Sequence, residues 1–147
     1  MTLPSQPDPP RWVTARVDAG FHTRIAARAH GINADEPLEL GGTDRGMTPY
    51  ELLLASLSSC MAMTMRMYSD RKGWPLETVT VQLRTAPARD ADSEVRVSGA
   101  KSVTRIERHV ELAGPLTDEQ RARIIEIGDR CPVKRNLEAG IQVIEAA

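Results

Sequence analysis

Alternating apolar and polar positions predict five strands, and their expected ranges are 11–17, 21–29, 77–85, 103–112 and 141–144. The first two are separated by Ala19-Gly20, a plausible turn, so they are expected to form an N-terminal β-hairpin. Residues 30–47 are rich in glycine and aspartate and are expected to be a long loop, of the kind that is usually functional or disordered. The polar segment 87–101 is expected to be a mobile excursion.

The strongest helix signal in the chain begins at Thr48. Thr48 is a good N-cap, Pro49 is favoured at the first helical position, and Glu51 follows the cap at the spacing of a capping box. The helix is expected to end at about residue 71, because Gly73 and Pro75 stop it. Its first four turns are apolar or small on every face, which predicts a long central helix that is buried all round.

Two shorter helices are expected near the C-terminus. Thr117 and Gln120 have the spacing of a second capping box, which predicts a helix from Thr117. Cys131 and Pro132 interrupt it, and a third helix is expected over 132–139. The mixed order of strands and helices is typical of an α+β fold.

Length and composition limit the classes of protein that the chain can belong to. The 147 residues suit one domain, expected over 12–147, and the proline-punctuated residues 1–11 are expected to be a disordered tail. With 19 Lys+Arg against 20 Asp+Glu and 3% aromatic residues, a nucleic-acid partner is not expected. The sequence shows neither a signal peptide nor a run of about 20 apolar residues, so we expect a soluble cytoplasmic protein without a membrane partner.

The chain has two cysteines, Cys60 and Cys131, and a permanent disulfide is not expected in a reducing cytoplasm. Cys60 lies midway along the predicted central helix, where a lone cysteine is usually a small inert apolar residue. Cys131 is the predicted N-cap of the third helix, where free N–H groups and the helix dipole favour a thiolate. Two interpretations stay open: two inert buried thiols, or one reactive thiol with a partner.

Other residues offer weaker chemistry. A run of alternate methionines could line an adaptable pocket, but core filling is favoured: Met61, Met63, Met65 and Met67. His30, Asp35 and Glu36 could imitate a metal cluster, but no second pair of ligands follows them, so no metal is expected.

Four motifs together resemble the OsmC/Ohr family: GGTDRG at 41–46, TPYELLLASLSSC at 48–60, YSDRKG at 68–73 and CPVKRNL at 131–137. The resemblance implies an intertwined homodimer of α+β subunits around central helices. It also implies thiol-dependent reduction of organic hydroperoxides in defence against oxidative stress. No cofactor is implied, since an external dithiol supplies the electrons.

The resemblance also implies roles for individual residues. Cys60 corresponds to the peroxidatic thiol and Cys131 to the resolving thiol, and an apolar pocket beside Cys60 would select carbon-bearing peroxides. The family's activating arginine comes from the N-terminal hairpin, where Arg24 is the first candidate and Arg28 the second. The family's catalytic glutamate directly follows the proline of its motif.

In this chain Tyr50 occupies the position of that glutamate, and Glu51 follows one residue later. Glu51 is therefore a candidate for catalysis or for helix capping alone. This displacement keeps an alternative open: a non-catalytic protein with the OsmC scaffold that binds a small apolar ligand. A metal-dependent hydrolase is a third hypothesis.

Overall fold

The computed structural model describes residues 12–86 and 104–145. The predicted tail over 1–11 and the predicted excursion over 87–101 lie outside the described residues. The chain divides into two compact units, Met1–Leu53 and Leu54–Ala147. The prediction of a single domain over 12–147 stays a prediction.

The first unit contains a three-stranded antiparallel sheet in the order β1(Thr14–Val17), β2(Thr23–Ala27) and β3(His30–Ala34). The predicted hairpin of β1 and β2 is confirmed, and Ile25 pairs with Ala15 on one side and with Ile32 on the other. The expectation of a continuous loop over 30–47 is wrong, because the first residues of this segment form β3. Glycine and asparagine disfavour strands locally, and only pairing with β2 makes this segment extended.

The rest of that segment is organised around Asp35, of which 2% is exposed. Its carboxylate accepts hydrogen bonds from the backbone N–H groups of Glu36, Thr43 and Arg45 and from the Thr43 hydroxyl. The Thr43 hydroxyl makes the largest contribution to holding the pKa of Asp35 below its usual value. A Cβ on Gly42 would lie 1.8 Å from the Glu36 carbonyl oxygen, so only glycine fits there. The short 3₁₀ helix η1(Leu38–Leu40) completes this turn-rich segment.

The helix α1(Pro49–Lys72) has the predicted start and nearly the predicted end. Its capping box is formed as expected, with the Thr48 N–H donating to Glu51 Oε2 at 2.8 Å and the Glu51 N–H donating to Thr48 Oγ1 at 3.2 Å. The expectation of burial on every face is wrong for this single chain. One stripe is buried, at Leu57, Met61, Met65 and Ser69, while Met63 is 64% and Met67 72% exposed.

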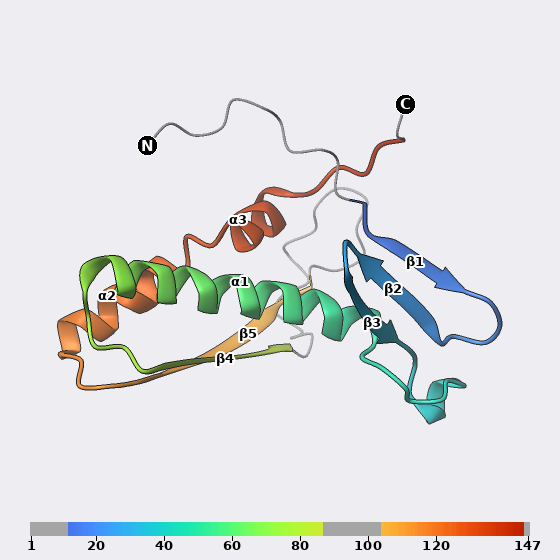
Figure 1. Cartoon of the computed structure of the whole chain (residues 1–147), viewed down its shortest axis with the longest axis horizontal. Coiled ribbons are helices and arrows are strands. Elements are labelled where there is room, and N and C mark those ends of the chain that lie inside the picture. Colours follow the sequence, from blue (N-terminus) through green and yellow to red (C-terminus); the bar gives the residue numbers. More distant parts are fainter. Residues whose placement is uncertain (1–11, 87–103, 146–147) are drawn as a thin grey trace, which may run out of the picture. The chain divides into compact units, whose positions relative to one another are not determined.

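The second unit packs the antiparallel hairpin β4(Thr78–Thr85) and β5(Ile106–Ala113) and the helices α2(Asp118–Gly128) and α3(Pro132–Ala139) around α1. In Figure 1, α1 runs between this hairpin and α3. A Cβ on Gly128 would lie 3.0 Å from the Met65 side chain, so glycine lets α2 approach α1 closely. The buried core comes from α1, α2 and the connecting segments: Leu57, Met61, Met65, Leu76, Leu116, Ile124 and Cys131. Half-buried Val81 of β4, Val110 of β5 and Leu137 of α3 pack against it.

The predicted capping box of Thr117 and Gln120 is confirmed at the start of α2. The predicted closing strand over 141–144 is wrong, because these residues are exposed and have no regular structure. Their composition favours a strand, but no strand of the described chain pairs with them. No helix in the described part of the chain is long and apolar enough to cross a membrane.

Candidate active site around Cys60 and Cys131

The second unit brings the two cysteines, far apart in the sequence, close together. Cys60 lies midway along α1, and Cys131 lies at the junction between α2 and α3. Cys60 packs against the core cluster that contains Cys131, and the Cys60 thiol is near enough to raise the pKa of Cys131. Both thiols are free. Two neighbouring thiols can be oxidised to a disulfide.

Local sequence explains the position of Cys131. It is the N-cap of α3, as predicted, with Pro132 at the first helical position. The Lys134 N–H donates to Cys131 Sγ at 3.4 Å, which satisfies one of the free donors at this helix end. The cap therefore holds the sulfur in a defined place beside α1.

The expectation of a thiolate at Cys131 is wrong. Cys131 is fully buried, and this burial makes the largest contribution to raising the pKa of its thiol. The interaction with the Cys60 thiol raises the pKa further, while the Lys134 N–H acts in the opposite direction. Desolvation of the buried thiol therefore outweighs the effect of the free N–H groups at the start of α3, and Cys131 stays protonated. Cys60 is only half-buried and is the more accessible of the two thiols.

Cys60 lies in the wall of an open pocket of about 850 Å³ between α1, α2 and the start of α3. The lining is mostly apolar, and Met63, Met67, Ile127 and Val133 contribute to it. The four methionines of the run therefore lie on two different faces of α1. Met61 and Met65 fill the core, as favoured from the sequence, while Met63 and Met67 line this pocket.

Two arginines in the pocket lining were missed by the sequence analysis: Arg71 and Arg130. The Arg130 guanidinium binds Glu126 Oε1 at 2.8 Å. The Arg71 guanidinium lies 5.6 Å from the centroid of the Tyr68 ring. Arg130 directly precedes Cys131 in the sequence, which was the one signal that could have identified it.

The other predicted site residues lie in the first unit, where Arg24 and Glu51 have partners. The Arg24 guanidinium on β2 binds Asp18 at 2.9 Å. Arg28 occupies the turn after β2 with a φ of 56°. Glu51 accepts the Thr48 N–H in the capping box of α1. Capping by Glu51 is therefore confirmed, and catalytic roles for Arg24 and Glu51 stay predictions.

The metal hypothesis finds no cluster to support it. Across residues 12–86 and 104–145, no three His, Cys, Asp or Glu side chains are grouped so that they could hold a metal ion. Both carboxylate oxygens of Asp35 already accept hydrogen bonds from their own loop.

A family model described as OsmC-like protein matches residues 42–145. The fold is similar to that of several solved structures at low sequence identity. The OsmC-like protein from Mycoplasma pneumoniae is 18% identical with a TM-score of 0.70, covering 89% of each chain. An organic hydroperoxide resistance protein OsmC from Legionella pneumophila is 15% identical with a TM-score of 0.63, covering 88% of this chain and 90% of that one.

A second protein described as an organic hydroperoxide resistance protein comes from Elizabethkingia anophelis. It is 18% identical with a TM-score of 0.59, and the match covers 88% of this chain and 89% of that one. A comparison with curated proteins finds no match. At these identities the solved structures establish the shared fold, including its α+β class.

Proposed function

Because the chain belongs to the OsmC-like protein family, we propose that it is a thiol peroxidase that reduces organic hydroperoxides to alcohols. The observation that carries this proposal is the proximity of the two thiols in one core cluster, where Cys60 lies in a pocket wall and Cys131 is buried. Two structural neighbours are described as organic hydroperoxide resistance proteins, which agrees with this choice of substrate class.

The reaction consists of three balanced steps. The Cys60 thiolate attacks the terminal peroxide oxygen, the O–O bond breaks, and the alkoxide takes up a proton and leaves as the alcohol. Cys60 is now a sulfenic acid, and the Cys131 sulfur attacks it, forming the disulfide and releasing water. An external dithiol then reduces this disulfide by thiol exchange and becomes oxidised itself.

Burial assigns the two roles within this proposal. A substrate in the pocket can reach Cys60, while Cys131 is fully buried behind it. Burial raises the pKa of the Cys131 thiol, so Cys60 is the thiol that is offered to the substrate as nucleophile. The mostly apolar lining favours a carbon-bearing peroxide over hydrogen peroxide, because burying the organic group is favourable.

We also propose that the protein is a homodimer in a reducing compartment such as the cytoplasm. Four large apolar side chains on α1 are exposed in the single chain: Tyr50, Leu53, Met63 and Met67. Exposed apolar patches of this kind usually mark an interface. The absolute mass from light scattering decides between a dimer and a monomer, and a monomer at micromolar concentration contradicts the proposal.

The peroxidase proposal is tested by following the consumption of cumene hydroperoxide and hydrogen peroxide with a dithiol reductant. Cys60→Ser is expected to reduce the rate to background, since the hydroxyl cannot replace the nucleophilic thiolate. Cys131→Ser is expected to consume one equivalent rapidly, to accumulate a trappable sulfenic acid and to lose the intramolecular disulfide. Thr80→Ser, on the exposed face of β4, serves as a control with wild-type activity.

Retention of activity by Cys60→Ser contradicts this proposal. A wild-type protein that consumes no peroxide but binds a small apolar ligand in the Cys60 pocket would instead support the non-catalytic alternative. The contacts of Arg24 with Asp18 and of Glu51 with Thr48 favour that alternative, because both candidate groups already have partners.

A further inference from the structure

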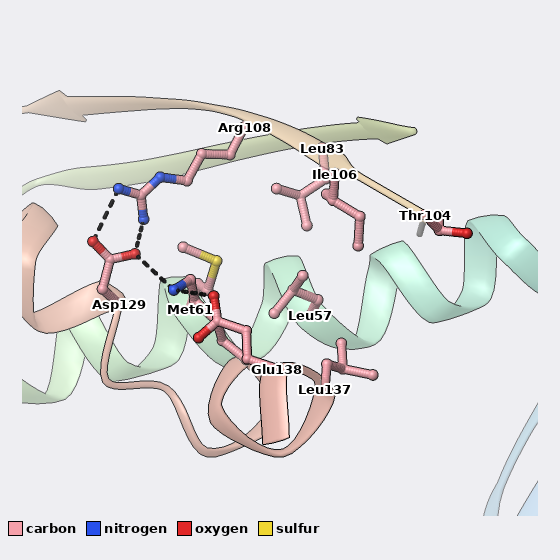
Figure 2. Close-up of a pocket in the computed structure, with 10 residues that line it drawn as sticks. Leu57, Met61, Leu83, Thr104, Ile106, Arg108, Asp129, Leu137 and Glu138 are labelled. Atoms are coloured by element: carbon pink, nitrogen blue, oxygen red, sulfur yellow. Dashed lines mark hydrogen bonds and ion pairs between the residues drawn. The ribbon is translucent and has the colours of Figure 1, made fainter. Parts of the chain in front are cut away.

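A second pocket lies in the same unit and shares no lining residue with the Cys60 pocket. Its volume is about 620 Å³, within the usual range for small-molecule sites. Four elements supply its apolar lining: Leu57 and Met61 come from α1, Leu83 from β4, Ile106 from the start of β5, and Leu137 from α3. In Figure 2 these side chains surround an open space over α1.

Charged side chains close one end of this pocket. The Arg108 guanidinium binds both carboxylate oxygens of Asp129, one of them at 3.0 Å. Lys134 Nζ lies 3.7 Å from Asp129 and 2.8 Å from Glu138. Figure 2 shows these ion pairs as a continuous chain beside the apolar lining. Two cations and two carboxylates balance, so the pocket end is neutral but strongly polar.

The two cations at this end are less exposed than the carboxylates: the side chains of Arg108 and Lys134 are 31% and 28% exposed, against 37% for Asp129 and 64% for Glu138. A guanidinium has five N–H groups, and within the described chain Arg108 uses two of them, both toward Asp129. Lys134 has a third N–H beyond those directed at Asp129 and Glu138. Asp129 is already bound by both cations, and Glu138 is largely exposed. A ligand group that accepts hydrogen bonds therefore fits this end better than one that donates them.

We propose that this pocket binds a small amphipathic carboxylate, with its apolar body over Leu57 and Met61 and its head at Arg108 and Lys134. The apolar lining supplies the affinity for the body by removing it from water. The remaining N–H donors supply charge-assisted hydrogen bonds to the head, which are stronger than bonds to a neutral group. The site is separate from the cysteine chemistry, so its existence does not depend on peroxidase activity.

The test is a titration of the full-length reduced protein with sodium decanoate, decanol and decylammonium, followed by amide NMR. Decanoate is expected to bind saturably, roughly tenfold more tightly than decanol, and decylammonium most weakly. Its shifts are expected at Leu83, Ile106 and Leu137. Shifts confined to Ser59, Cys60 and Val133, equal affinity for the three probes, or no saturable binding would each overturn the proposal.

A matched pair of variants tests the head-group contact. Arg108→Met removes the donors but keeps an apolar stem, and is expected to weaken decanoate binding about tenfold while leaving decanol unchanged. Arg84→Met is the control, because Arg84 on β4 also pairs with a carboxylate, Glu107, but lies outside this pocket. Equal losses in the two variants contradict the proposal. If Arg108→Met does not fold, the wild-type order of affinities and the location of the shifts decide.

Discussion

Cys131 has a structural role that can be separated from its proposed redox role. Its sulfur accepts the Lys134 N–H as the N-cap of α3 and is fully buried. Cys131→Ala removes the cap, at a cost of about 1 kcal/mol, and leaves a small cavity, at a cost of about 1 kcal/mol more. The free energy of unfolding is therefore expected to fall by about 2 kcal/mol. For a chain of this size that corresponds to a decrease in Tm of roughly 4–8 °C.

Cys131→Ser is expected to lose clearly less stability, under about 1 kcal/mol. A serine hydroxyl is a preferred N-cap and can accept the Lys134 N–H. The hydroxyl also fills part of the space of the sulfur at this buried position, so the cavity is smaller than in the alanine variant. Both variants lack the thiol, and only the alanine variant lacks the cap.

The assay is urea unfolding followed by far-UV circular dichroism with excess reductant, so that no disulfide contributes to stability. Cys60→Ser is measured alongside, because it removes the other thiol of the pair without affecting the cap. An alanine variant within about 0.5 kcal/mol of wild type, or a serine variant as unstable as the alanine variant, would refute the capping argument.

Three further predictions concern the core and the Asp35 segment. Met65→Ala, at a fully buried position of α1, is expected to lower the free energy of unfolding in urea by about 2–5 kcal/mol. Met65→Leu keeps most of the volume and is expected to lower it by less than about 1.5 kcal/mol. Equal losses in the two variants would contradict the packing described. The lowered pKa of Asp35 stabilises the fold above the unfolded-state pKa of about 4, and this contribution is lost as pH falls through the folded pKa. Asp35→Asn is therefore expected to be less stable at pH 7 and to lose less stability between pH 7 and 3 than wild type, and parallel pH profiles would contradict this. Gly42→Ala is expected to lower Tm by several degrees, because its Cβ would meet the Glu36 backbone; an unchanged melting curve would contradict the close approach.

The local signals in the sequence were reliable guides to the helices. Thr48 and Glu51, Thr117 and Gln120, and Cys131 with Pro132 all occupy the predicted caps. Each cap depends on a hydrogen bond between residues at most three positions apart, so the sequence alone contains the information. Strand prediction was weaker, since β3 depends on pairing with β2 and residues 141–144 have no such partner.

The chemistry of the site depends on contacts that no local pattern contains. The sequence identified Cys60 and Cys131 as the residues to examine, and the motifs around them indicated the family. Only the tertiary structure placed the two thiols near each other, buried Cys131 and divided the methionines between core and pocket. The physical reason is that capping acts within one helical turn, whereas desolvation and packing depend on which distant segments cover a side chain.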